Sequence, residues 1–391
     1  SENDLDRAPL MGAGPLYQLP TPALLLDWGV MTRNIARMAD RAAELGVLLR
    51  PHGKTPKCPK IGRALLARQA KGLCVSTLLE AEQYFDGGIG DLFYSTALGP
   101  SKAERAASLL ERGAQLSCVL DDPAALLEIA AIMAARGQTL PVMIEIAVDD
   151  YRSGVPASDA RFRTLLQGLT TREGVSLAGI MSYAGASYGL HDVAPVQALT
   201  ETHRQALVST RDALRASGIA VERVSLGSTP AILHARTLEG ITEARCGIYV
   251  FQDLMQAAIG ACRVEDIAVS VLAEIISVQP HLGRFIIDAG ALALSKDRST
   301  ASSPHDAGYG LVADAHTGAV LDGLYVSQVS QELGVVTARG ALPLDTGRFR
   351  VGDRVRVLPN HTDMTAAAYT GYHVLQERSD SPQWLARFNH W

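Results

Sequence analysis

Short apolar runs alternate with longer amphipathic stretches from residue 22 to residue 251. The amphipathic stretches have helical period, as at 31–45, 102–112, 123–135 and 196–216. The continuous apolar runs are typical of strands buried on both faces of a parallel sheet, and their alternation with helices indicates βα units. Eight such units in about 230 residues predict an α/β fold, a (β/α)8 TIM-type barrel, with a doubly wound open sheet as the alternative. The predicted strands are 47–50, 72–77, 91–96, 116–121, 140–148, 177–185, 223–229 and 243–251.

The pattern changes after residue 262, where apolar runs follow one another without helical stretches between them. This succession of apolar runs without helical stretches predicts an all-β domain. Residues 296–310 are rich in Ser, Asp and Gly, which indicates a long surface loop. We therefore predict a barrel over 20–261 and a C-terminal β domain over 262–391 that also includes 8–19. The predicted strands of this domain are 264–279, 284–290, 311–314, 323–331, 350–359 and 370–376.

Composition and charge narrow the class of protein. The 391 residues are 47% hydrophobic with a net charge of −5, which allows a large core and leaves no basic face for nucleic acid. The five cysteines are an odd number without CxxC pairs, which argues against a disulfide framework and favours a reducing compartment. No apolar run reaches membrane-spanning length and no signal peptide opens the chain. We expect a soluble, cytoplasmic protein.

The residues after the seventh predicted strand have the composition of an anion site. Gly227, Ser228 and Thr229 precede Pro230, which suits the first turn of a helix. Such a segment offers free backbone N–H groups, hydroxyls and the positive end of a helix dipole. Barrels often bind phosphate after strands seven and eight, so we predict a phosphate site here; a simple helix cap is the alternative.

Lys54 follows the first predicted strand, where a barrel places catalytic groups. A lysine that forms a Schiff base has to be partly desolvated, and a barrel mouth with several cations suits it. Arg50, His52 and Lys57 are close to Lys54 in the chain and fit this interpretation. The alternative is an ordinary surface lysine.

His361 and Asp363 form a possible metal pair near the end of the chain. On a strand, positions two apart face the same side, so the two side chains would offer one metal a nitrogen and an oxygen. A pair this small is often only a surface hydrogen bond, which is the alternative, because metal sites usually show more ligands.

Residues 50–55, Arg-Pro-His-Gly-Lys-Thr, resemble the cofactor-lysine motif of the D-threonine aldolase and D-serine dehydratase family. These are fold-type III pyridoxal-phosphate enzymes, related more distantly to alanine racemase. The resemblance runs from Leu19 to the His361-x-Asp363 pair. It implies an alanine-racemase-like barrel followed by a β domain, and a homodimer with the active site at the subunit interface. It also implies pyridoxal 5'-phosphate and a divalent metal (Mn, Mg or Zn) as cofactors.

The resemblance implies a role for individual residues. Lys54 would carry the cofactor as a Schiff base, and Arg152 would approach the pyridine ring and keep its nitrogen unprotonated. His361 and Asp363 match the metal ligands. The other cofactor-binding residues that it implies are His52, Tyr183, Gly227, Ser228, Thr229, Gly247, Ile248 and Tyr249.

The resemblance also implies a reaction. Asp363 favours the aldolase branch, because aldolases carry His-x-Asp at the metal site and dehydratases carry His-x-Cys. We therefore predict a lyase that cleaves D-3-hydroxy amino acids to glycine and an aldehyde, with His191 as the nearest candidate for the base.

Three other functions stay open. Residues 226–230 and 359–361 look more like the dehydratase branch, so deamination of D-serine or D-3-hydroxyaspartate to a 2-oxo acid and ammonia is the main alternative. A racemase of the same fold type needs no metal, and a non-catalytic pyridoxal-phosphate carrier is usually a lone barrel. The metal pair counts against the racemase, and the β domain with its metal pair counts against the carrier.

Overall fold

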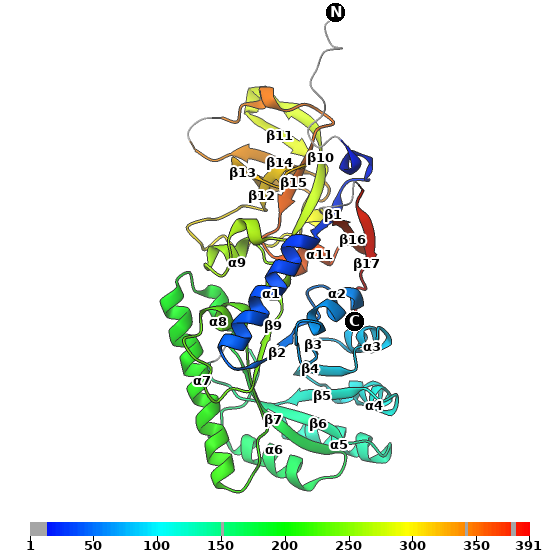
Figure 1. Ribbon diagram of the computed structural model, residues 1–391, viewed down its shortest axis with the longest axis vertical. Helices are drawn as coiled ribbons and strands as arrows, with labels where there is room; N and C mark the ends of the chain where they lie inside the picture. The colour runs from blue at the N-terminus through cyan, green and yellow to red at the C-terminus, as the bar shows by residue number, and fades with distance from the viewer. Residues whose placement is uncertain (1–13, 150–151, 341–342, 377–380) are drawn as a thin grey trace, which may run out of the picture. The chain divides into compact units, whose positions relative to one another are not determined.

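The computed structural model describes residues 14–149, 152–340, 343–376 and 381–391. The chain folds into two compact units (Figure 1). The barrel unit comprises residues 35–249 and 388–391, and the β unit comprises residues up to 34 and residues 250–387. The division falls inside the first long helix, α1 (Trp28–Glu44), and again after Tyr249.

Eight parallel strands form the sheet of the barrel unit (Figure 1). Their order is β2-β9-β8-β7-β6-β5-β4-β3. An isolated parallel bridge between His52, just after β2, and Cys74 of β3 joins the two ends of this sheet. The predicted barrel is therefore confirmed. The strands are β2 (Leu48–Pro51), β3 (Leu73–Val75), β4 (Asp91–Ala97), β5 (Gln115–Leu120), β6 (Leu140–Glu145), β7 (Val175–Tyr183), β8 (Arg223–Gly227) and β9 (Glu243–Cys246).

Helices connect the barrel strands, and α5 shows why they form where they do. Asp122 caps α5 by accepting the N–H of Ala125 at 2.8 Å, and Pro123 occupies the first turn, where its missing N–H costs nothing. The helix buries Leu126, Ile129, Ala130 and Met133, which share one face at helical spacing. The connecting helices are α2 (Pro59–Leu66), α3 (Leu78–Asp86), α4 (Ala103–Glu111), α5 (Pro123–Ala135), α6 (Ala160–Thr171), α7 (Val193–Ala216) and α8 (Thr229–His234).

The interior of the barrel has an apolar part and an ionic part. Strands β3 to β7 each contribute one residue to a buried apolar cluster of Cys74, Phe93, Val119, Met143 and Met181. The guanidinium of Arg223, on β8, lies 4.9 Å from the centroid of the Phe93 ring on β4. Three strands separate β8 from β4 in the sheet, so this contact crosses the barrel. Charged side chains therefore fill the part of the interior next to β2, β8 and β9.

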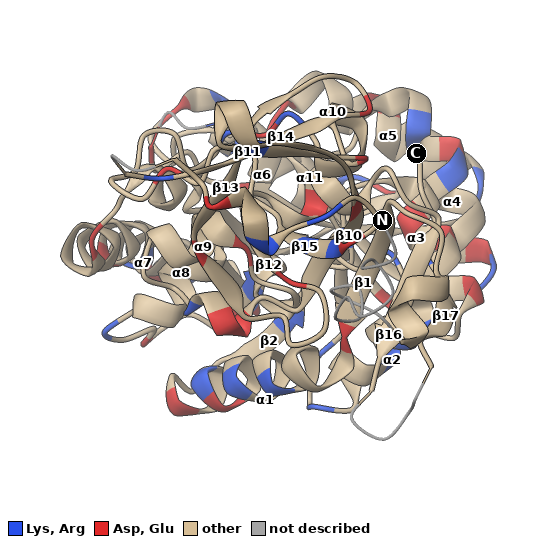
Figure 2. Cartoon of the chain, turned by 90° about the horizontal axis from the view of Figure 1, so that it is seen from above, with Lys and Arg blue, Asp and Glu red and all other residues tan. Residues whose placement is uncertain are grey.

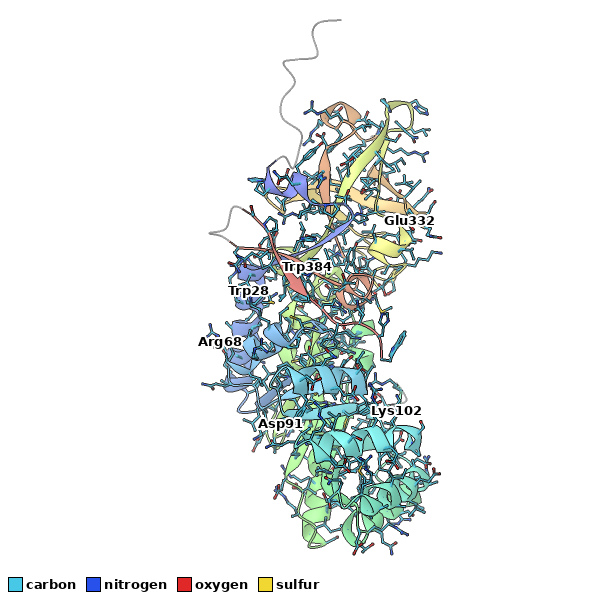
Figure 3. The ribbon with its side chains drawn as sticks, turned by 90° about the vertical axis from the view of Figure 1, so that its right-hand side faces the viewer. Trp28, Arg68, Asp91, Lys102, Glu332 and Trp384 are labelled. Carbon is cyan, nitrogen blue, oxygen red and sulfur yellow. The ribbon has the colours of Figure 1, made fainter. Side chains whose placement is uncertain are left out.

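Glu243 is the centre of the ionic part. Its carboxylate accepts hydrogen bonds from Arg50 Nε at 2.8 Å, Arg223 Nη2 at 3.2 Å and Ser225 Oγ at 2.9 Å. Arg50 also donates to Asp91, the first residue of β4, at 2.6 Å (Figure 3). Burial opposes ionisation of Glu243, but the charges of Arg50 and Arg223 lower its pKa to about 2. The carboxylate is therefore ionised and paired at neutral pH.

Nine strands form the sheet of the β unit. Their order is β11-β14-β13-β12-β15-β10-β1-β16-β17, and a further pairing of β11 with β10 closes six of them into a ring. The pairing is antiparallel except between β1 and β16. Glu332 marks the turn between β13 and β14 (Figure 3). The strands are β1 (Ala23–Asp27), β10 (Val269–Gln279), β11 (Arg284–Ile287), β12 (Leu311–Asp314), β13 (Val320–Val329), β14 (Gly334–Ala338), β15 (Arg354–Leu358), β16 (Gly371–Leu375) and β17 (Gln383–Ala386).

The unit boundaries differ from the predicted ones. Residues 20–34 and 250–261 were predicted in the barrel but belong to the β unit. Residues 388–391 were predicted in the β domain but belong to the barrel unit. Strand β1 pairs with β10 and β16, and its residues Leu24, Leu25 and Leu26 are all buried. A continuous apolar run of this kind does not reveal which sheet it joins. Part of the predicted β domain, residues 8–13, lies outside the described residues.

Three short helices complete the β unit: α9 (Leu254–Ala258), α10 (Ala291–Leu294) and α11 (Thr362–Ala366). Between α10 and β12 the described chain forms neither helix nor strand over 296–310, as predicted. Strands β14 and β17 were not predicted. Both strands are short and partly exposed, so they lack the apolar run by which the other strands were predicted.

Acidic and basic side chains are interspersed on the outer helices of the barrel. Arg136, at the end of α5, forms ion pairs with Glu104 and Glu111 of α4, and Figure 2 shows blue and red residues side by side on these helices. Across the described ranges, no helix combines the length and the apolar character that a membrane span requires.

Candidate active site

The carboxyl ends of parallel barrel strands lie on one rim, and the predicted cofactor residues follow these ends. The structure thereby brings together residues that are up to about 195 positions apart in the chain, as the topology predicts. Lys54 follows β2, Arg152 follows β6, Tyr183 ends β7, Gly227 ends β8, and Gly247 follows β9.

The loop that carries Lys54 is fixed to both neighbouring strands. The N–H of His52 donates to the carbonyl of Cys246 on β9 at 2.8 Å, and the N–H of Gly53 donates to the carbonyl of Cys74 on β3 at 2.7 Å. The Tyr84 hydroxyl donates to the carbonyl of Gly53 at 2.6 Å. A Cβ at Gly53 would lie 2.4 Å from the Tyr84 ring, so only glycine fits. The half-buried Lys54 thus extends from a rigid backbone.

His52 lies among the cations of this rim. Burial lowers the pKa of His52 well below its usual value, and the charges of Lys54, Arg245 and Arg152 lower it further. The imidazole is therefore neutral: Nδ1 accepts the N–H of Lys54 at 3.3 Å, and Nε2 lies 3.1 Å from Ser95 Oγ. Lys54, Arg245 and Arg152 supply the several cations that we predicted around a cofactor lysine, whereas His52 is a neutral ring among them.

Arg152 stacks on Tyr183. The guanidinium carbon lies 4.3 Å from the centroid of the Tyr183 ring, which is within the range of a cation–π contact. The next residue, Ser153, donates through its hydroxyl to Glu145 at 2.7 Å and ties the loop to the end of β6. These contacts hold the exposed Arg152 side chain at the rim, where its planar donors can meet a ring nitrogen.

The segment from Gly227 to Thr229 links β8 to α8. Ser228 caps α8 by accepting the N–H of Ala231 at 3.2 Å, and its hydroxyl lies 2.9 Å from that of Ser187. The Thr229 hydroxyl is buried and has no hydrogen-bond partner in the described part of the chain. Ser228 therefore serves as the cap that was the alternative interpretation, and Thr229 keeps a donor for an anion.

Residues 247–249 form the neighbouring part of the rim. A Cβ at Gly247 would lie 2.7 Å from His52 Cβ, so this position packs tightly against the lysine loop. Ile248 and Tyr249 begin the short 3-10 helix η4 (Ile248–Val250). Burial raises the pKa of Tyr249 well above its usual value, and its hydroxyl has no partner among the residues described. With Thr229, the rim thus offers two buried, unpaired hydroxyls, which fits the phosphate of pyridoxal phosphate.

His191 lies at the same rim, between the 3-10 helix η3 (Gly185–Gly189) and α7. Its Nδ1 is buried and has no partner within the described ranges. The bond between Ser187 and Ser228 ties η3 to the phosphate segment. This placement is compatible with the predicted base, and the role of His191 stays a prediction.

The sequence analysis missed His203. This residue of α7 is buried, and its ring lies 3.0 Å from Ser182 Oγ through Nδ1 and 3.0 Å from Asp149 Oδ2 through Nε2. It joins the loop after β6 to the end of β7, the two segments that carry Arg152 and Tyr183. The signal in the sequence is a histidine within the apolar face of an amphipathic helix.

The predicted strand geometry of His361 and Asp363 is wrong. Strand β15 ends at Leu358, and His361 is instead the N-cap of α11. His361 Nδ1 accepts the N–H of Met364 at the long distance of 3.4 Å. Ligation through Nε2 would give up this bond, because the ring proton would then sit on Nδ1. One carboxylate oxygen of Asp363, Oδ1, is buried without a partner among the described residues.

This donor set fits a divalent metal, because it combines an imidazole nitrogen with an unpaired carboxylate oxygen. The described residues contain no group of three or more His, Cys, Asp or Glu side chains that could hold a metal ion. The pair therefore supplies at most two ligands from this region.

Comparison with known proteins agrees with the geometry of the rim. Residues 26–255 match the alanine racemase N-terminal domain family, and residues 268–375 match the putative serine dehydratase domain family. The D-threo-3-hydroxyaspartate dehydratase of Delftia sp. (strain HT23) is 42% identical, over 94% of this chain and 97% of its own. Its solved structure has a TM-score of 0.91 and covers 97% of this chain and 100% of that one. The D-threonine aldolase of Arthrobacter sp. is 30% identical, over 94% of this chain and 92% of its own.

The matches cover both units of the chain, and the rim carries Lys54, Arg152 and two buried hydroxyls, on Thr229 and Tyr249, that have no partner among the described residues. This chain is a member of the D-threonine aldolase and D-serine dehydratase family of fold-type III pyridoxal-phosphate-dependent lyases.

Proposed function

We propose that the protein is a metal-dependent lyase of D-3-hydroxy amino acids. The observation that carries this proposal is the lysine loop at the rim of the barrel unit, which hydrogen bonds fix to both neighbouring strands. The β unit separately contributes a His-x-Asp pair with an unpaired buried oxygen among the described residues. Relatives named for dehydration and for aldol cleavage of such substrates support it. A substituted form of a D-threo-3-hydroxyaspartate dehydratase has also been solved metal-free, which supports metal binding in the family.

Each of the candidate site residues has a proposed task. Lys54 carries the cofactor, Thr229 and Tyr249 donate to its phosphate, and Arg152 donates to its pyridine nitrogen. When bound, pyridoxal phosphate accepts the electron pair that is left on Cα when a bond to Cα breaks. His361 and Asp363 hold a divalent ion whose contribution is to polarise the 3-hydroxyl of the substrate.

Two bond cleavages are possible with these groups. In dehydration, Lys54 Nζ, once the substrate amine has released it, would remove the Cα proton, and the 3-hydroxyl would take up a proton and leave as water. Hydrolysis of the resulting imine would then yield a 2-oxo acid and ammonia. In aldol cleavage, His191 would take the proton of the 3-hydroxyl, the Cα–Cβ bond would break to release the aldehyde, and Cα would then take up a proton to give glycine. The 42% identity with a dehydratase favours dehydration, and Asp363, an oxygen ligand, favours aldol cleavage.

A product assay tests this proposal. The protein, loaded with pyridoxal phosphate and Mn²⁺, Mg²⁺ or Zn²⁺, is given D-threonine, D-serine and both D-3-hydroxyaspartate diastereomers, and aldehyde and 2-oxo acid are measured separately. We expect turnover of at least one D-3-hydroxy amino acid and its loss with a chelator. Turnover of D-alanine to L-alanine alone, or activity unchanged by the chelator, would overturn the proposal.

We further propose that the enzyme acts as a cytoplasmic homodimer. The resemblance to its family supports the dimer, and the free state of all five cysteines fits a reducing compartment. Light scattering of the holoenzyme at micromolar concentration tests the assembly, and a fully active monomer would contradict it.

A further inference from the structure

The segment that carries the metal pair is anchored immediately before His361. The side chain of Asn360 is buried and makes three hydrogen bonds. Its amide nitrogen donates to the carbonyls of Asp297 at 2.9 Å and Gly308 at 2.6 Å, and its oxygen accepts from Thr300 Oγ1 at 3.0 Å. These contacts fix the main chain on the N-terminal side of the pair.

Asp253 anchors the same segment between the two proposed ligands. Its side chain is fully buried, at 0% exposure. Oδ1 accepts the N–H of Gln256 at 2.9 Å, and Oδ2 accepts the N–H of Thr362, the residue between His361 and Asp363, at 3.0 Å. One carboxylate thus joins the first turn of α9 to the first turn of α11. This bond spans 109 positions of sequence.

Main-chain hydrogen bonds reinforce this junction. The N–H groups of Leu254 and Met255 donate to the carbonyls of Pro359 and Asn360 at 3.1 and 3.2 Å. The chain on both sides of His361 is therefore held by residues that are not themselves candidate ligands. Asp363 Oδ1, in contrast, is buried without a partner in the described part of the structure.

We propose that Asp253 is a positioning residue for the metal pair, and this inference rests on the proposed function. By holding the N–H of Thr362, the carboxylate sets the direction in which the His361 and Asp363 side chains leave the main chain. Metal affinity depends on such support, and loss of a supporting group typically weakens binding about 10–100-fold.

Two substitutions test the hydrogen bond between Thr362 N–H and the Asp253 carboxylate, one from the acceptor side and one from the donor side. Asp253→Asn keeps the size of the side chain, but whichever way its amide is turned, one of the two N–H groups loses its acceptor. Thr362→Pro removes the donor, and its Cδ, which takes the place of the N–H hydrogen, also displaces the Asp253 carboxylate from it. Proline suits the first position of α11, because that N–H is not needed by the helix and His361 is extended, with φ −134° and ψ 104°.

Asp353→Asn is the matched control. Asp353 is also a buried aspartate of the β unit, and its carboxylate accepts the N–H of Arg350 at 3.0 Å. Like Asp253, it accepts a main-chain N–H, but it also forms an ion pair with Arg350 at 3.6 Å and supports a turn at a different place in the sequence. His361→Ala is the control for loss of a ligand.

The experiment measures the affinity of the full chain, loaded with pyridoxal phosphate, for Zn²⁺ and Mn²⁺ by competition with a chromophoric chelator. Circular dichroism and the visible cofactor band report folding independently of metal. We expect Asp253→Asn and Thr362→Pro each to weaken binding about 10–100-fold, and Asp353→Asn to bind like wild type. Should Asp253→Asn fail to fold, Thr362→Pro decides.

Three results would overturn the inference. If Asp253→Asn or Thr362→Pro folds and binds metal like wild type while His361→Ala does not bind, Asp253 has no positioning role and the metal site stands. If Asp353→Asn weakens binding as much as Asp253→Asn, the effect is general loss of stability. If His361→Ala binds like wild type, the metal pair itself is wrong, and the proposed function fails with the inference.

Discussion

Replacement of Glu243 by Gln should destabilise the barrel strongly. Glu243 is buried and paired with Arg50 at 2.8 Å and Arg223 at 3.2 Å. The substitution keeps the shape of the side chain and removes its charge. Arg50, which is buried, then keeps Asp91 at 2.6 Å but loses Glu243, and the partly exposed Arg223 loses its ion pair with Glu243. Removal of one partner from a buried ion pair typically costs about 3–5 kcal/mol.

The pKa gives a second estimate of the same quantity. Arg50 and Arg223 outweigh burial and lower the pKa of Glu243 from 4.5 to about 2. A shift of this size corresponds to roughly 3 kcal/mol, since one pKa unit is about 1.4 kcal/mol. For a unit of this size, the melting temperature should fall by about 6–15 °C. Because the folded-state pKa is lowered, this stabilisation is complete above pH 4.5 and is lost as the pH falls from 4.5 toward 2.

The assay is thermal unfolding of wild type and Glu243→Gln across this pH range, with Glu82→Gln as control. Glu82 pairs with Arg105 at the surface, where a salt bridge contributes about 0–1 kcal/mol. The Glu243→Gln difference should be constant above pH 4.5 and shrink below it, and Glu82→Gln should change little. A Glu243→Gln midpoint within about 2 °C of wild type would refute the role of this network.

Three further predictions concern the reaction and the rim. Substrates of D configuration should turn over and their L-enantiomers should not, as chiral analysis of the substrate that remains from a racemic mixture would show; L-specific turnover would contradict the assignment. Asp363→Cys should raise the ratio of 2-oxo acid to aldehyde several-fold, because a softer thiolate favours zinc, and an unchanged ratio would remove Asp363 as the determinant. His203→Ala breaks one buried and one part-buried hydrogen bond and should lower stability by about 1–3 kcal/mol in a denaturant titration; a smaller loss would mean that the bonds to Asp149 and Ser182 contribute little.

The barrel was predictable because its strands are buried on both faces and appear as continuous apolar runs. The range predicted for α5 agrees with the structure, since Asp122 and Pro123 mark its beginning and its apolar face has helical spacing. The location of the candidate site residues at one rim could be predicted in the same way, because the carboxyl ends of parallel barrel strands lie together. Lys54, Arg152 and Thr229 were therefore expected at one rim from the chain alone.

Contacts between distant residues were not predictable from local patterns. The bond from His203 to Asp149 spans 54 positions, and the bond from Asp253 to Thr362 spans 109. Glu243 and Arg223 stand in predicted strands, but only the closed barrel shows that they meet inside it. No local pattern near His361 showed that β15 would end at Leu358, because the carboxylate of Asp253, 109 positions away from Thr362, holds the first N–H of α11.

The central claim is that Lys54 carries the cofactor. Purified protein should absorb visible light as a yellow complex, and borohydride reduction followed by peptide mapping should find the pyridoxyl label on Lys54. Lys57 is a nearby internal control for the label, because its Nζ forms an ion pair with Glu80 at 3.6 Å. The account predicts a label on Lys54 alone and loss of turnover in Lys54→Ala. A label on Lys57 or any other lysine, or wild-type turnover by Lys54→Ala, would contradict it.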